Sequence, residues 1–448
     1  MSFNAVRCFP ALTLAAAFCI LNSCFAGEPK KPLTPAELVQ IAKSNTVDPE
    51  VRQGAIRKLG DITEAEERAL GVSEIFLDIV KGSSDPFVAR EAVKALTRLQ
   101  VNVSKRPKTK FIKDFTLIIR DKNAIPGVRS EIAQCFSETL DKDELNDKEA
   151  FKALREIAQN KSEPNVAMRG RCIEAMGKFG DPDAIVLLCE LLSDPDGYIK
   201  EFAAIAISSL LDKAPAAGTN VSLGAINKIV EMVNDDKLAV DLRVVVILAD
   251  AKLMVAGTPG ANKGLDTIIK LVATAQEDKI VLASIQALGI IGTPQATDPL
   301  IKTYDDFFNA AKVDNEKDVP VRRAVARALR AVLCAQGIKP TPDLQTVHKI
   351  AVLLVKIVDR ENPAELTPVK ESAIYAIGYL YPKKFAGEQK DAAFVLIKLL
   401  ENKLTDATLK AMIPDILEAI TRVNFGPDPA RWNDWFSKTY PGARAAAQ

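Results

Sequence analysis

A pattern of apolar residues that recurs about every 40 residues constrains the fold of this chain more than any other feature. Most copies begin with an apolar anchor and continue with apolar residues four, five and eight positions later, as at Val88, which is followed by Ala92, Val93 and Leu96. Those offsets place four side chains on one face of an α-helix. The pattern therefore predicts about ten helices that bury the same face, with anchors at Val51, Val88, Val128, Met168, Ile199, Leu242, Ile280, Val321, Val369 and Leu409.

Signals for helix ends and for close packing accompany the anchors. An acid followed by proline stands before three of the anchor helices, where the acid can cap the helix and the proline can occupy its first turn: Asp48-Pro49, Asp85-Pro86 and Asp194-Pro195. A glycine follows four anchors by nine residues, where it either ends the helix or lets the next helix approach closely: Gly60, Gly177, Gly289 and Gly378. The copy at Leu242 departs from the pattern, because Asp250 stands where an apolar residue is expected.

Two stretches carry a resemblance to a known family. Residues 175–195 and residues 287–292 are similar to the consensus of HEAT repeats, and the period of about 40 residues lies in the range of HEAT and armadillo repeats. The resemblance extends over residues 36–423. It implies an all-α fold, an α–α superhelix of helical hairpins, with the second helix of each hairpin on a concave side that offers an extended binding surface.

The N-terminus has the pattern of an export signal. Arg7 precedes an apolar run, residues 8–20, which is too short to span a bilayer. Two processing sites are open: cleavage after Ala26, or cleavage before Cys24, which then becomes a lipidated first residue. We therefore expect a signal peptide at 1–26, a linker at 27–35, and a mature chain in the periplasm or cell envelope, either secreted or lipid-anchored, with no transmembrane span.

Both tryptophans of the chain, Trp432 and Trp435, lie three residues apart in a predicted short helix near the C-terminus. The last unit of a repeat stack needs a cover for its open apolar edge, and two indoles provide one. We therefore assign residues 424–448 to a cap and a disordered tail.

Four cysteines lie beyond the signal region, and two of them, Cys172 and Cys189, flank a predicted turn at Gly180–Pro182. Two alternatives stay open for this pair. They are buried apolar thiols, or they form a disulfide if the helix pair brings their Cα atoms within about 7 Å.

A basic residue follows most anchors and is the most regular polar feature of the repeats. We call this row of basic residues the ladder, and two interpretations of it compete. Its side chains either bind acidic partners, or they have a structural role and pair with turn aspartates of the same or the adjacent unit. The second is favoured. The ladder comprises Arg52, Arg129, Arg169, Lys200, Arg243, Arg322 and Lys370.

Histidine usage limits the chemistry that the chain can perform. His348 is the only histidine, so zinc sites of several histidines and di-iron sites of His-Glu pairs cannot be assembled. We expect no catalytic residue, no metal and no cofactor, and therefore no enzyme.

The leading functional hypothesis is a scaffold that binds a protein partner. The near-zero net charge of +1 does not favour nucleic acid. Two alternatives remain: a chromophore- or ligand-binding protein similar to the HEAT-like phycobilin lyases, and a permanent structural subunit of an envelope complex.

Overall fold

Helices make up the regular structure of the residues that the computed structural model describes, which are 32–102, 109–139, 145–310, 318–360, 365–380 and 385–441. Within these ranges there is no strand. The predicted signal peptide with Cys24, most of the linker, and the tail beyond residue 441 lie outside them. The chain divides into two compact units, one ending at Arg106 and one beginning at Pro107.

The first unit contains five described helices: α2 (Pro35–Lys43), α3 (Pro49–Leu59), α4 (Glu64–Leu70), α5 (Val72–Gly82) and α6 (Pro86–Asn102). The two anchor helices, α3 and α6, pack against each other, while α2 packs on α3 and α5 on α6.

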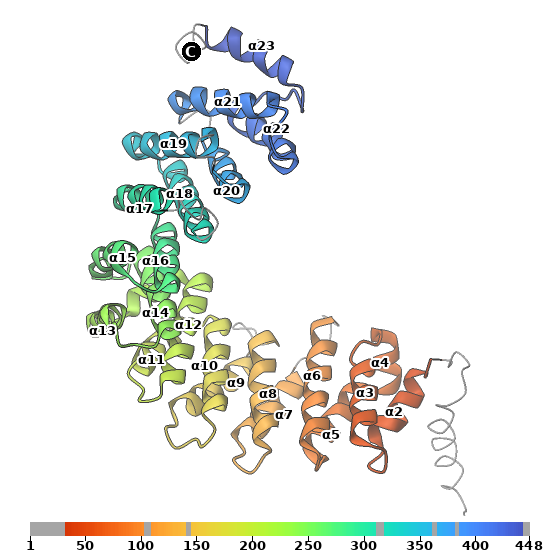
Figure 1. Cartoon of the computed structure of the whole chain (residues 1–448). Helices are drawn as coiled ribbons and strands as arrows, with labels where there is room; N and C mark the ends of the chain where they lie inside the picture. Colours follow the sequence, from red (N-terminus) through yellow and green to blue (C-terminus); the bar gives the residue numbers. More distant parts are fainter. Residues whose placement is uncertain are drawn as a thin grey trace, which may run out of the picture. The chain divides into compact units, whose positions relative to one another are not determined.

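The second unit consists of helical hairpins whose helices form two rows (Figure 1). The first helices are α7 (Thr109–Arg120), α9 (Leu145–Gln159), α11 (Ala184–Leu191), α13 (Leu223–Asn234), α15 (Lys263–Thr274), α17 (Thr297–Ala310), α19 (Leu344–Asp359) and α21 (Ala386–Glu401). The second helices are α8 (Pro126–Thr139), α10 (Val166–Phe179), α12 (Gly197–Lys213), α14 (Val240–Val255), α16 (Asp278–Ile291), α18 (Val319–Ile338), α20 (Thr367–Ile377) and α22 (Ala407–Thr421). Each second helix packs on the next one, from α8 through α22.

The anchors lie where the sequence places them. Every anchor falls within a second helix or its equivalent in the first unit, and all of them are buried except the half-buried Val51. Stacking neighbours thus buries one continuous apolar layer in each unit. This confirms the prediction of an all-α repeat fold.

Two of the three predicted acid–proline starts have the expected geometry. The carboxylates of Asp48 and Asp85 accept hydrogen bonds from backbone N–H groups in the first turns of α3 and α6. The prediction was wrong for Asp194-Pro195, because α12 is capped by Asp196, which accepts from the N–H of Tyr198 at 2.8 Å. Asp194 instead accepts hydrogen bonds from Arg169 and from the N–H of Asp196.

Gly177 lets two second helices approach closely. A Cβ at this position would lie 2.6 Å from both the Cα and the carbonyl oxygen of Ala206 on α12. Backbone atoms of a packed helix cannot move away without shifting the helix, so the glycine is required by packing. The equivalent Gly289 faces Ala328 on α18 in the same way, with Cβ–Cα and Cβ–Cβ distances of 3.0 and 3.1 Å.

We therefore expect Gly177→Ala to lower the free energy of unfolding by about 1–3 kcal/mol, because the overpacking outweighs the helix propensity gained from alanine. Gly54→Ala in α3 is the matched control, since a Cβ there would meet no atom within 4 Å. The control should be neutral or stabilising by up to about 1 kcal/mol. Urea unfolding followed by circular dichroism measures both, and equal effects at the two positions would contradict the packing argument.

Two short 3₁₀ segments and one last helix complete the second unit. The segments are η2 (Pro215–Asn220) and η3 (Pro294–Ala296), and the last helix is α23 (Pro429–Thr439). α23 packs on α21. Its Trp432 is fully buried and donates its indole N–H to the carbonyl of Gly426 at 2.8 Å, and Trp435 meets it edge to face at 5.8 Å between ring centroids.

Candidate binding surface

The second helices of the second unit expose the side chain six residues after each anchor. Side chains zero, four, five and eight residues after the anchor face the core, so a side chain six residues after the anchor points to the opposite side of the helix. Each of these side chains is half-buried or exposed. Because the second helices pack in sequence, we treat these positions and their exposed neighbours as one surface, the second-helix strip. Its central residues are Gln134, Glu174, Ile205, Leu248, Gln286, Arg327, Tyr375 and Asp415.

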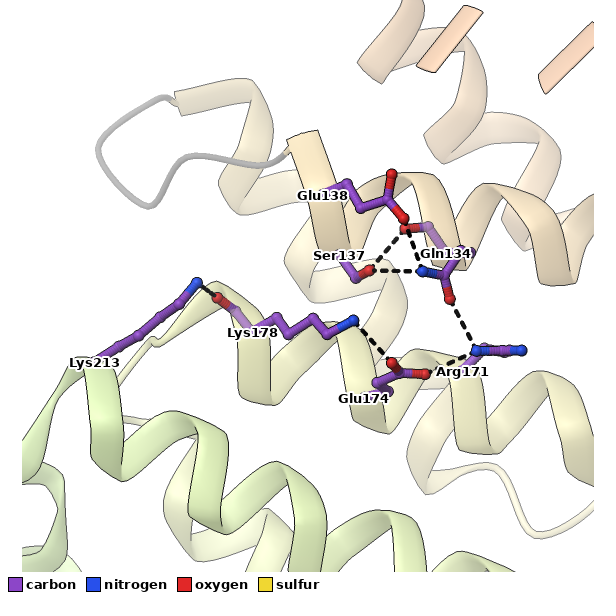
Figure 2. A network of polar contacts seen from close by, with 7 residues as sticks. All are labelled: Gln134, Ser137, Glu138, Arg171, Glu174, Lys178 and Lys213. Atoms are coloured by element: carbon purple, nitrogen blue, oxygen red, sulfur yellow. Dashed lines mark hydrogen bonds and ion pairs between the residues drawn. The ribbon is translucent and has the colours of Figure 1, made fainter. Parts of the chain in front are cut away.

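On α8 and α10 the polar side chains of the strip satisfy one another (Figure 2). Arg171 donates to Gln134 at 2.9 Å and to Glu174 at 3.0 Å, and Lys178 donates to the other oxygen of Glu174 at 2.8 Å. Burial opposes ionisation of Glu174, but Lys178 and Arg171 hold its pKa below the ordinary value. Lys213 from α12 extends the chain of contacts to the carbonyl of Lys178. This section therefore has little unused hydrogen-bonding capacity.

On α12 and α14 the strip becomes apolar. Phe202 and Ile205 on α12, and Val245 and Leu248 on α14, are half-buried at equivalent positions of their helices. Tyr198 is 59% exposed and its ring centroid lies 5.4 Å from that of Phe202. Large apolar side chains that neighbouring helices leave partly uncovered are typical of surfaces that bind another protein.

On α18 and α20 the strip is basic and aromatic. Arg327 is exposed and Arg323 is half-buried on α18, and Tyr375 on α20 is 47% exposed. The guanidinium of Arg330 lies 5.8 Å from the ring centroid of Tyr379. Arginine and tyrosine are the residues that contribute most often to strong protein–protein contacts.

The predicted basic ladder lies away from this strip, and five of its seven members are buried. Five members donate, at 2.8–3.3 Å, to a backbone carbonyl at the end of the preceding helix, where such carbonyls lack intrahelical partners. The pairs are Arg52 to Ala42, Arg129 to Ile119, Arg169 to Ala158, Arg243 to Val233, and Lys370 to Arg360.

Three ladder arginines also pair with buried carboxylates. Arg169 reaches Asp194, a predicted partner, at 2.7 Å. Arg129 reaches Glu163 at 2.9 Å and Arg322 reaches Glu365 at 2.5 Å, and neither glutamate was anticipated from the sequence. Lys200 is half-buried, and its ammonium group contacts no polar group of a described residue. Glu163 lies five residues before the anchor Met168, and Glu365 lies four residues before Val369. Asp194 has the same place before Ile199, so a search for either acid just before each anchor would have found both glutamates.

Asp250 is the most unusual charged group of the second unit. It is fully buried, and neither carboxylate oxygen has a hydrogen-bond partner among the described residues. The carboxylate lies against Gly264 near the start of α15, where a Cβ would collide with it. Burial raises the pKa of Asp250 to about 7, and no charged neighbour contributes. The sequence marked Asp250 as a break in the pattern but did not reveal this environment.

The predicted cysteine pair consists of free thiols in this structure, and both side chains are buried. Burial raises the pKa of Cys172 far above its ordinary value and that of Cys189 to about 12. Cys334 on α18 is half-buried. Since the thiolate is the reactive form, burial and a raised pKa both slow attack on an electrophile.

We expect iodoacetamide to modify Cys334 at least ten times faster than Cys172 or Cys189 in the native protein at pH 8. Mass spectrometry of the intact chain and of its peptides at successive times measures the three rates. The unfolded, unreduced chain is the control, in which all three cysteines should react fully. If Cys172 and Cys189 stay unmodified there and react only after reduction, the disulfide alternative is correct instead.

Other chemical features of the second unit are few. A shallow depression of about 250 Å³ lies between α11 and α13 and is lined in part by Glu190, Ser193, Asn220 and Lys228. His348 on α19 is exposed, and its Nδ1 lies 3.0 Å from Glu388. Among the described residues, no three histidine, cysteine or acidic side chains gather as a metal site, and no helix is long and apolar enough to cross a membrane.

Two family models match parts of the chain. A model of HEAT repeats matches residues 112–208, and a model of the PBS lyase HEAT-like repeat matches residues 281–306. A comparison with curated protein sequences gave no match. The first matched segment runs from α7 into α12, and the second runs from α16 into α17.

Solved structures with a similar fold include those of Kap121p and importin beta. A Kap121p mutant shares 12% identity at a TM-score of 0.55, covering 94% of this chain and 46% of its own. Importin beta in a polyethylene glycol condition shares 14% identity at a TM-score of 0.53, covering 90% and 61%. The chain thus spans about half the length of these proteins, and the likeness concerns the fold alone. The CpcE–CpcF complex of phycocyanin lyase from Nostoc sp. PCC7120 shares 17% identity over 74% of this chain and 98% of its own, at a TM-score of only 0.32.

The repeat register, the stacked helical hairpins and the two matching family models agree with one another. The two matched segments carry HEAT repeats, and the same register of stacked helical hairpins continues through the rest of the second unit.

Proposed function

We propose that this protein is a non-catalytic scaffold that binds a protein partner along the second-helix strip, in the periplasm or at the cell envelope. The observation that carries the proposal is the change of character along the strip. The polar side chains on α8 and α10 hydrogen-bond to one another. By contrast, large apolar side chains on α12 and α14 are left partly uncovered, and Arg323 and Arg327 on α18 have no polar partner among the described residues. Surfaces that combine partly covered apolar groups with arginine and tyrosine are suited to protein recognition.

The location outside the cytoplasm rests on the N-terminal sequence, with Arg7, the apolar run 8–20 and the two processing sites. Cell fractionation with mass spectrometry of the mature N-terminus tests it. A chain that begins at Gly27, or at a lipidated Cys24, is the expected result. A chain that retains its first residues in the cytoplasm would contradict this part of the proposal.

Site-specific photo-crosslinking in the native cells tests the binding face. A benzophenone amino acid placed at Ile205, Leu248 or Tyr375 should crosslink to a partner protein at a fixed mass. Matched controls are exposed apolar positions on first helices, Leu117 on α7 and Val352 on α19, which are 62% and 51% exposed. Crosslinks from the control positions alone would move the binding face to the first helices, and crosslinks from neither set would count against a scaffold.

A further inference from the structure

The arginines of α18 form a stripe along the second-helix strip. Arg323, Arg327 and Arg330 follow one another at intervals of four and three residues, so their side chains leave the same face of the helix. The 20 residues of α18 contain four arginines and no acidic residue. The fourth, Arg322, turns into the core, where its side chain is fully buried and pairs with Glu365.

Two of the three stripe arginines have no partner within the described part of the chain. No hydrogen bond or ion pair involves the guanidinium of Arg323 or Arg327, although the Nε of Arg323 is shielded from solvent. An N–H group that is shielded from water and donates to nothing is costly, and an added acceptor would relieve that cost. The third stripe residue, Arg330, lies over the ring of Tyr379, and this contact orients its guanidinium.

The neighbouring helices do not neutralise this charge. α16 presents the uncharged Gln286 at the position equivalent to Arg327, and α20 presents the exposed Tyr375. Glu371 on α20 is equivalent to Arg323 but forms no ion pair with it. The contrast with α10 is direct, because there Arg171 and Lys178 share the carboxylate of Glu174.

We propose that α18 and α20 bind an extended acidic segment of a protein partner, with carboxylates on Arg323 and Arg327 and with apolar side chains on the α12–α14 section, which lies beyond α16. The proposal rests on the scaffold function proposed above and names the chemistry of its partner. Guanidinium groups pair with carboxylates in a bidentate way, which supplies both strength and orientation. A protein segment fits better than nucleic acid, because apolar side chains such as Leu248 share the strip and the chain has a net charge of only +1.

A random 16-residue peptide library displayed on phage and selected on the full-length protein tests the proposal. We expect the selected peptides to be enriched in aspartate and glutamate beside apolar residues. Their synthetic versions should bind at least ten times more weakly to the triple variant Arg323→Gln, Arg327→Gln, Arg330→Gln. Binding should also weaken as the salt concentration rises, because part of the attraction is ionic.

The matched control carries Lys148→Gln, Lys152→Gln and Arg155→Gln on α9. These exposed basic residues have the same four-and-three spacing, have no polar partner among the described residues, and lie on a first helix. The control should bind the peptides as the parent protein does, and circular dichroism should show both variants folded. Equal weakening in the two variants would attribute the effect to net charge and overturn the proposal.

The remaining outcomes separate this proposal from the scaffold function. The selected peptides could lack acidic residues, and their binding could be abolished by Leu248→Glu but not by the triple arginine change. That result would overturn the acidic partner and retain the scaffold function. No enrichment at all would count against both. Tight, sequence-independent binding of a single-stranded oligonucleotide that is lost in the triple variant would assign the stripe to nucleic acid instead.

Discussion

Asp250→Asn is expected to stabilise the protein by about 4 kcal/mol at pH 8 and by less than about 1 kcal/mol at pH 4. The folded protein raises the pKa of this carboxyl from 3.8 to about 7, and a difference of that size corresponds to about 4 kcal/mol. The cause is burial without a hydrogen bond, since both carboxylate oxygens lack a partner among the described residues. Asparagine has almost the same shape and cannot ionise.

The sign of the pH dependence follows from the direction of the pKa change. Because the folded state holds the proton more tightly than the unfolded state, the contribution of this group to stability is complete below pH 4. It is lost as the pH rises from about 4 to about 7 and is constant above that range. At each pH, the free energy of unfolding of the parent protein is subtracted from that of the asparagine variant. The difference cancels the contributions of the titratable groups that both proteins share.

Urea unfolding of both proteins at several pH values between 4 and 8 measures this difference. Hydrogen exchange in α14 and α15 should show the same trend locally, because repeat proteins respond mainly in the units that are changed. A stability difference that is constant with pH, or that shrinks as the pH rises, would contradict the buried and unpartnered environment of Asp250.

Glu365→Ala is expected to lower the free energy of unfolding by about 3–5 kcal/mol. Glu365 accepts from Arg322 on α18 at 2.5 Å, from the hydroxyl of Tyr304 on α17, and from the N–H of Leu366 at the start of α20 at 2.9 Å. The side chains of Arg322 and Glu365 are both fully buried. Removing the carboxylate takes this counter-ion away from a buried guanidinium, which is far more costly than losing an exposed pair.

A double-mutant cycle isolates the coupling of the pair. Arg322→Met alone should also destabilise strongly, whereas Arg322→Met with Glu365→Leu should cost clearly less than the sum of the single changes. The exposed pair Arg68–Glu64 on α4 is the control, with an expected coupling of about 0.2–0.5 kcal/mol. Additive effects at Arg322 and Glu365 would contradict a tightly coupled buried pair.

The repeat fold was predictable because its signal is local and recurs. An apolar face at fixed offsets in one helix returns about every 40 residues, so errors at one copy, such as the misplaced cap at Asp194, do not disturb the register. The position of the ladder residues was predictable for the same reason. Their main acceptors, helix-end carbonyls about ten residues earlier, follow from the length of the turn, although the prediction favoured aspartates instead.

The binding surface was less predictable because it depends on distances between helices. The offset of six residues identifies which side chains face outward. Nothing in the pattern shows that Arg171 hydrogen-bonds to Gln134, whereas Arg327 has no polar partner within the described ranges. Glu163 and Glu365 enter the core from the turns before α10 and α20, and they were missed because only aspartates were considered as partners. Asp250 required knowledge of how closely α15 approaches α14, which Gly264 permits.

Hydroxyl-radical footprinting of the protein with and without its crosslinked partner tests binding along the second-helix strip, because it reads the exposure of individual side chains. We expect the partner to protect Tyr198, Phe202 and Tyr375 on the strip, while Leu117 and Leu344 on first helices oxidise at unchanged rates. Protection confined to the first helices, with the strip as reactive as in the free protein, would contradict binding along the strip.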